Sequence, residues 1–78
     1  MQLYKGQCIQ RTPKEHPDKG DGFINIIGGS VFQIRDVDDR CITVRVLTCN
    51  MPSYVGGEMS IPCKYLTDDT YFVPLFTL

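Results

Sequence analysis

Apolar and polar residues alternate with a period close to two along most of the chain. No window of about eleven or more residues shows the stripe of apolar positions that an amphipathic helix has. The clearest segment is CITVRVL, residues 41–47, in which Ile42, Val44 and Val46 fall on one face of a strand and the residues between them on the other. A packed face opposite a largely solvated face is typical of an antiparallel sheet. This segment therefore predicts a strand with one side in the core.

The same alternation predicts shorter strands elsewhere in the chain. The expected strands are 3–10, 23–27, 30–37, 41–47, 59–63 and 70–75, with a single helical turn near 64–69. Polar, proline- and glycine-containing segments at 11–22 and 48–58 are expected to be irregular loops, Gly6 a bulge or bend, and Gly28-Gly29 a turn. Five to six short antiparallel strands with almost no helix predict an all-β fold, a small barrel or curled sheet whose partial closure protects its edges.

The order of a strand, a long loop, a turn, a hairpin, a short strand, a one-turn helix and a last strand resembles the SH3-like barrel. The stretch GEMSIPCKYL, residues 57–66, is similar to the family signature in which a tyrosine follows a proline at the third position and an aliphatic residue comes next. The resemblance places Pro62 and Tyr65 in the peptide groove of the family and Leu66 in its core. The hairpin at residues 29–46 also resembles the strand–turn–strand unit of SH3-like and KOW-type barrels.

The chain departs from the peptide-binding members of that family in three places. It has no tryptophan, the residue that occupies the middle of their groove, and its aromatic opening motif is reduced to Leu3-Tyr4. The ending TYFVPLFTL is longer and more apolar than is usual for the family. We therefore expect the helical turn to be present but not the groove that recognises PxxP peptides.

Length and charge limit the possible function. Seventy-eight residues are expected to form a single domain, residues 1–78, with a core too small for a deep catalytic cavity. The formal net charge of −1 lacks the basic excess of a typical nucleic-acid domain. The start MQLYKGQCIQ has no apolar run of the signal-peptide kind, and no stretch is long enough to span a membrane, so we expect a stand-alone cytoplasmic protein with no membrane partner.

The four cysteines are expected to be reduced and structural. Cys8, Cys41, Cys49 and Cys63 include no CxxC pair, which makes a zinc site a weak interpretation, although a disulfide framework stays open as an alternative. The aspartates of DVDD, residues 36–39, lack the glycine and closing glutamate of a calcium loop and are better explained as a polar turn. We expect no cofactor and no metal.

The sequence offers no set of residues that would support catalysis. The single histidine, His16, lies in the charged segment KEHPDKGDG without a fixed partner that could hold it as a general base. The glycines of GGS, residues 28–30, are too few for a phosphate cradle. The protein is therefore expected not to be an enzyme.

Surface recognition is the function that remains. The segment 48–58 carries more apolar residues than a solvated loop requires, either as a lid on the barrel or as an exposed anchor for a protein partner. The predicted partner-binding residues are Met51, Pro52, Tyr54, Val55 and Tyr65, with His16 and the 11–22 loop at the rim. The expected mechanism is occlusion of, and possible inhibition of, a larger host protein. A free-standing barrel of this size resembles the accessory or inhibitor proteins that bacteriophages and mobile elements encode.

Two alternatives accompany this interpretation. A KOW- or OB-type barrel would bind nucleic acid through a basic sheet face, for which the candidate residues are Lys5, Arg11, Arg35, Arg40 and Arg45. The apolar ending, residues 72–78, could pair with a second copy and give a homodimer.

Overall fold

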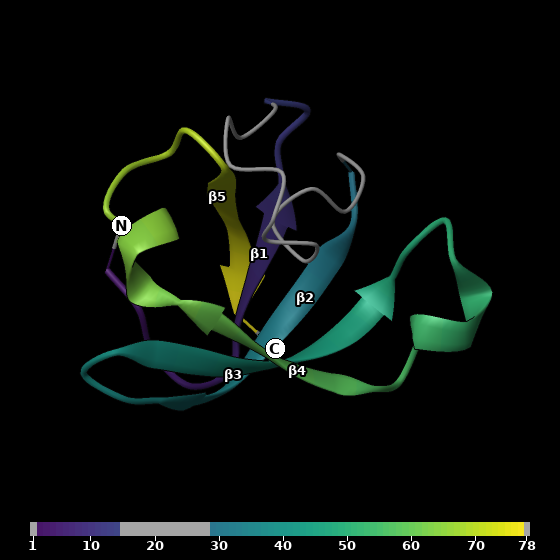
Figure 1. The fold of residues 1–78 in the computed structure, drawn as a ribbon, viewed down its shortest axis with the longest axis horizontal. Helices are drawn as coiled ribbons and strands as arrows, with labels where there is room; N and C mark the ends of the chain where they lie inside the picture. The colour runs from purple at the N-terminus through teal and green to yellow at the C-terminus, as the bar shows by residue number, and fades with distance from the viewer. Residues whose placement is uncertain (1, 15–28, 78) are drawn as a thin grey trace.

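The structure is a computed structural model that describes residues 2–14 and 29–77. Five strands make up its regular structure: β1 Gln7–Arg11, β2 Val31–Val37, β3 Cys41–Thr48, β4 Glu58–Pro62 and β5 Phe72–Thr77. Two 3-10 turns, η1 Pro52–Tyr54 and η2 Cys63–Tyr65, are the helical elements of the described part. The protein is therefore an all-β structure, as the alternating pattern predicts (Figure 1).

The described strands form one antiparallel sheet in the order β4-β3-β2-β1-β5. Strands β1 to β4 are neighbours in chain order, and β5 returns to the free side of β1. In the sheet, Ile9 of β1 faces Phe32 of β2 on one side and Pro74 of β5 on the other. Strand β1 therefore connects the hairpins to the last strand.

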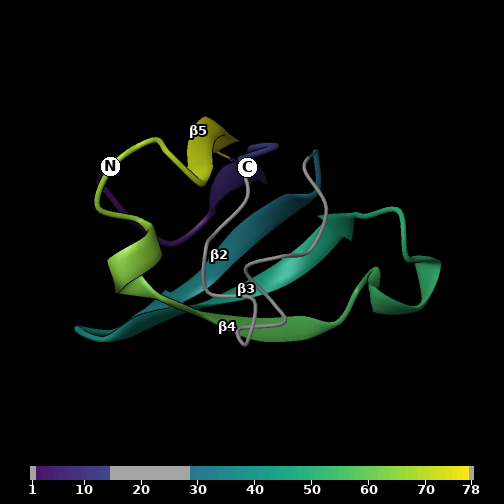
Figure 2. The same ribbon diagram turned by 45° about the horizontal axis from the view of Figure 1, so that its top comes forward.

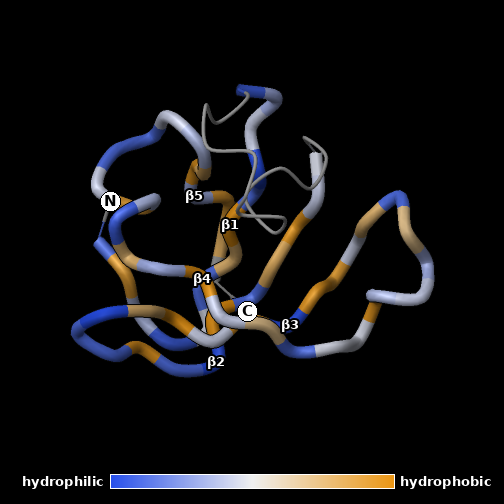
Figure 3. Tube along the Cα trace, viewed as in Figure 1, coloured by the Kyte–Doolittle hydropathy of each residue, from blue (hydrophilic) through white to orange (hydrophobic). Residues whose placement is uncertain are grey.

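The buried side of the sheet is the side that the alternation assigns to the core. Ile42, Val44 and Val46 of β3 are all buried, and the residues between them are half-buried. The register continues this face onto the neighbours, with Val44 opposite Ile34 of β2. The complete core cluster is Ile9, Phe32, Ile34, Ile42, Val44, Val46, Ile61, Tyr65, Leu66 and Phe72. Apolar and polar residues alternate along the strands in Figure 3.

Extra residues at three positions curl the sheet. Arg35 on β2 and Leu47 on β3 have no direct partner, and Leu75 and Phe76 of β5 together face the single residue Cys8. A bulge of this kind bends its strand and increases the local right-handed twist. The β1–β5 end of the sheet consequently lies above the β3–β4 end (Figure 2).

Because of this curl, the outermost strands contribute to the same core. Ile61 of β4 and Phe72 of β5 belong to one cluster although they lie at opposite ends of the strand order. Phe72 packs edge-on against Phe32, with 6.0 Å between the ring centroids. No backbone pairing joins β4 to β5 among the described residues, so these two strands are the ends of a curled sheet.

Arg11, which the sequence places in a solvated loop, is the last residue of β1 and is only 4% exposed. Its Nη1 donates to the carbonyl oxygen of Thr12 at 2.7 Å and to that of Tyr71 at 3.3 Å. Its guanidinium carbon lies 5.4 Å from the ring centroid of Tyr71 and 5.7 Å from that of Phe72. Burial lowers the pKa of Arg11 from its ordinary value. These contacts fasten the end of β1 to the start of β5.

Both outer strands carry a proline at a position that weakens pairing with a further strand. The backbone N–H and C=O of Arg11 bond to Ser30 and Gly29, so they point away from β5. The backbone groups of the facing Phe72 therefore point away from β1, to the open edge of the sheet. Those of Pro74, two residues further along β5, point the same way. A proline there has no N–H to offer an incoming strand. Pro62 of β4 has the same orientation, because the next amide, that of Cys63, donates inward to Arg40. A second copy that paired with the β5 edge, as expected for a homodimer through residues 72–78, would therefore lack one backbone N–H donor at Pro74.

Several predicted boundaries are corrected by the structure. The first strand begins at Gln7 rather than residue 3, because the chain turns at Gly6, whose φ of 90° suits a glycine. The helical turn predicted at 64–69 is the shorter η2, and the last strand spans Phe72–Thr77 instead of 70–75. The strand predicted at 23–27 and the greater part of the 11–22 loop lie outside the described residues.

Replacing Ile34 by alanine tests the assignment of the core. Ile34 is fully buried at the centre of β2, so we expect Ile34→Ala to lower the free energy of unfolding by about 2–5 kcal/mol. Val37→Ala is the matched control on the same strand, because the Val37 side chain is exposed and its truncation is expected to cost about 0.5 kcal/mol or less. Urea unfolding followed by circular dichroism gives both values. Equal costs would contradict the assignment.

Candidate functional site

The connection between β3 and β4, residues 49–57, projects from the sheet and is called the η1 loop below (Figure 1). Pro52 opens its 3-10 turn, where a fixed φ and the lack of an N–H cost nothing. The amide of Tyr54 donates to the carbonyl oxygen of Met51 at 3.0 Å, and that of Val55 donates to Pro52 at 3.2 Å. Gly56 ends the turn with a φ of 86°, a conformation that favours glycine. The loop thus has a defined backbone.

The base of the η1 loop is tied to the core. The amide of Val46 donates to the carbonyl oxygen of Gly57 at 2.9 Å, and its carbonyl accepts the amide of Gly56 at 2.8 Å. Val46 is itself a buried core residue. The amide of Gly57 donates to the carbonyl of Tyr54 at 3.0 Å, and this bond connects the base to the turn. The backbone of a buried β3 residue therefore anchors the base of the loop.

The side chains of the η1 loop face solvent. Met51 is 41% exposed, Tyr54 40% and Val55 48%, and no residue of η1 is buried. The sequence left two alternatives for this segment, a lid on the barrel or an exposed anchor. A lid folded onto the sheet would bury these side chains, whereas the structure shows them exposed to solvent. These three side chains, together with Pro52 of the same ordered turn, form the apolar tip of the loop, defined as Met51, Pro52, Tyr54 and Val55.

Tyr65 is not part of that surface. It lies in η2, is 4% exposed, and packs edge-on against Tyr71 with 6.2 Å between ring centroids. The adjacent Leu66 is also buried, and Pro62 is half-buried. Tyr65 is a core residue, so we remove it from the candidate contact surface. The sequence did not reveal this because a tyrosine after a proline fits a groove and a core equally well.

The basic residues considered for nucleic acid do not form one continuous face. Arg11 is buried between β1 and β5, whereas Arg40 lies in the exposed turn between β2 and β3. Lys5 is exposed at the turn before β1. Arg35 and Arg45 do share the outer face of the sheet, where Glu58 lies beside them: Arg35 Nε is 4.0 Å from Glu58 Oε2, and Arg45 directly faces Glu58 across β3 and β4.

The acidic turn between β2 and β3 is organised by its own hydrogen bonds. The side chains of Asp38 and Asp39 share a hydrogen bond, which lowers the pKa of Asp38 and raises that of Asp39. The amide of Arg40 donates to Asp38 Oδ1 at 3.2 Å and lowers the pKa of Asp38 further. Within residues 2–14 and 29–77, no three histidine, cysteine, aspartate or glutamate side chains gather as a metal site.

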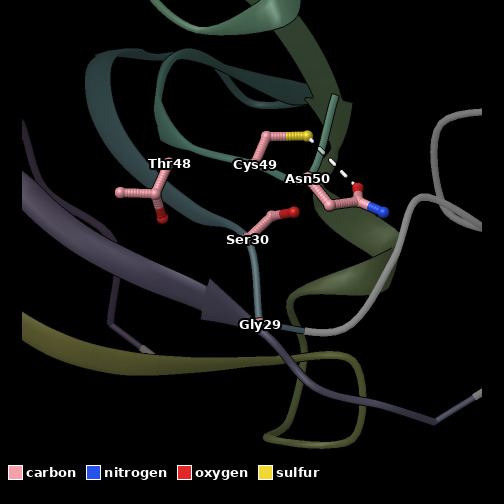
Figure 4. A pocket seen from close by; sticks show the side chains of 5 residues that line it. All are labelled: Gly29, Ser30, Thr48, Cys49 and Asn50. Carbon is pink, nitrogen blue, oxygen red and sulfur yellow. Dashed lines mark hydrogen bonds between the residues drawn. The ribbon is translucent and has the colours of Figure 1, made fainter. Parts of the chain in front are cut away.

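An open hollow of about 280 Å³ lies beside the base of the η1 loop, lined by Gly29, Ser30, Thr48, Cys49 and Asn50 (Figure 4). The thiol of Cys49 donates to Asn50 Oδ1 at 3.9 Å, and its sulfur accepts the amide of Met51 at 3.4 Å. These bonds hold Cys49 within the loop. The five described lining residues include no acid–base group that could activate the thiol or the Ser30 hydroxyl, so these five residues do not by themselves supply a catalytic site.

The four cysteines are free thiols in the structure, and one of them is enclosed. Cys8 is fully buried, whereas the other three are half-buried. Burial raises the pKa of the Cys8 thiol, and burial together with Cys41 and the turn aspartates raises that of Cys63. A raised pKa leaves a smaller fraction of each thiol as the reactive thiolate, so Cys8 and Cys63 are better suited to packing than to nucleophilic chemistry.

The comparisons with known proteins matched no family model, no curated protein and no solved structure. Among the helical elements that the structure describes, none has the length and apolar character that crossing a membrane demands. His16, named for the rim of the surface, lies outside the described residues. The candidate site therefore rests on the geometry of the η1 loop.

Truncating two tyrosines separates the apolar tip from the core. We expect Tyr54→Ala to change the free energy of unfolding by about 0.5 kcal/mol or less, because its side chain is 40% exposed and lies outside the core cluster. Tyr65→Ala should cost about 3 kcal/mol or more, because it empties a packed site. Thermal and urea unfolding of both variants measure this difference. A Tyr54→Ala variant that unfolds as readily as Tyr65→Ala would place Tyr54 in the core.

Proposed function

We propose that the protein is a non-enzymatic, SH3-like barrel module that binds a larger protein through the apolar tip of its η1 loop. The order of the described elements supports the SH3-like part of this proposal: β1, a long connection, the β2–β3 hairpin, a short β4, the single turn η2 and β5. The curl of the sheet, which brings β4 and β5 side chains into one core, is what a small barrel needs. The absent tryptophan argues that recognition uses another surface than the family groove.

The observation that carries the binding proposal is the exposure of the apolar tip on an ordered turn. Its three large side chains are 40–48% exposed, and the backbone under them is tied to Val46. Tyrosine and methionine are enriched in interface cores, where aromatic anchors supply much of the affinity. A turn already held in its bound shape loses little entropy when it docks. The mechanism that follows is occlusion, in which the tip covers a site on a larger host protein, as in the small inhibitors of phages and mobile elements.

The alternative of nucleic-acid binding is weaker for a physical reason. Arg11 is enclosed, and the two arginines on the sheet face lie beside Glu58, which opposes a track of phosphates. The remaining candidates, Lys5 and Arg40, lie in separate turns. The test below separates the two alternatives.

The tagged protein is used to capture its partner from lysate of its natural cell, with and without nuclease, in 50 and 500 mM salt. We expect one stoichiometric protein that survives nuclease and high salt, because apolar contacts are weakly screened. The double variant Met51→Ser, Tyr54→Ser should reduce recovery by at least about tenfold, the loss of roughly 1.4 kcal/mol.

The matched control is the double variant Leu75→Ser, Phe76→Ser, which removes two exposed apolar groups on β5 instead. It should leave capture unchanged. Equal loss from both variants would place the binding surface elsewhere or indicate non-specific adhesion. Loss of every partner on nuclease treatment would favour the nucleic-acid alternative.

A further inference from the structure

We draw no further inference here: the strongest candidate, the open hollow beside the base of the η1 loop, has one cysteine and no charged side chain among its described lining residues, and nothing in the structure shows what covers it.

Discussion

The structure depends on the burial of one face of a sheet against itself. The described strands form a single sheet, and they curl until the outermost of them share a core. The bulges at Arg35, Leu47 and the Leu75-Phe76 pair provide the bend. Strand β1 is central to this arrangement, because it pairs with both β2 and β5 and contributes Ile9 to the core cluster. The enclosed Arg11 then ties its end to Tyr71 and Phe72.

The same core determines what the surface can offer. Val46 is buried on β3, and its backbone closes the base of the η1 loop, so the packed core anchors a turn that its own hydrogen bonds shape. The open edges are less suited to recognition, because Pro62 and Pro74 each remove an outward donor. Natural sheets use such prolines to discourage pairing with other chains. Protected edges together with an exposed, ordered apolar tip favour recognition through side chains over strand addition.

The sequence predicted the elements that depend on local pattern. The alternation in CITVRVL identified β3 and its buried face, and the two strands of the β2–β3 hairpin were predicted within one residue of their bounds. It also named Met51, Tyr54 and Val55, which the structure leaves exposed in one loop.

The features that the sequence missed depend on contacts between separate elements of the fold. Arg11 looks like a loop residue until β5 returns beside it, and Tyr65 looks like a contact residue until Tyr71 packs on its ring. The bulges are likewise a property of pairing between strands and leave no mark in either strand alone. The grouping of Arg35, Arg45 and Glu58 follows from register, which a single strand does not specify.

The most direct measurement of the central claim is site-specific photocrosslinking in the natural cell. A benzophenone amino acid replaces Tyr54 at the apolar tip or, as the reference, Phe76 on β5, two residues that are both about half exposed. If the tip is the binding surface, illumination joins one protein to position 54 and none to position 76. A crosslink at position 76 alone, or to nucleic acid from either position, would contradict the account.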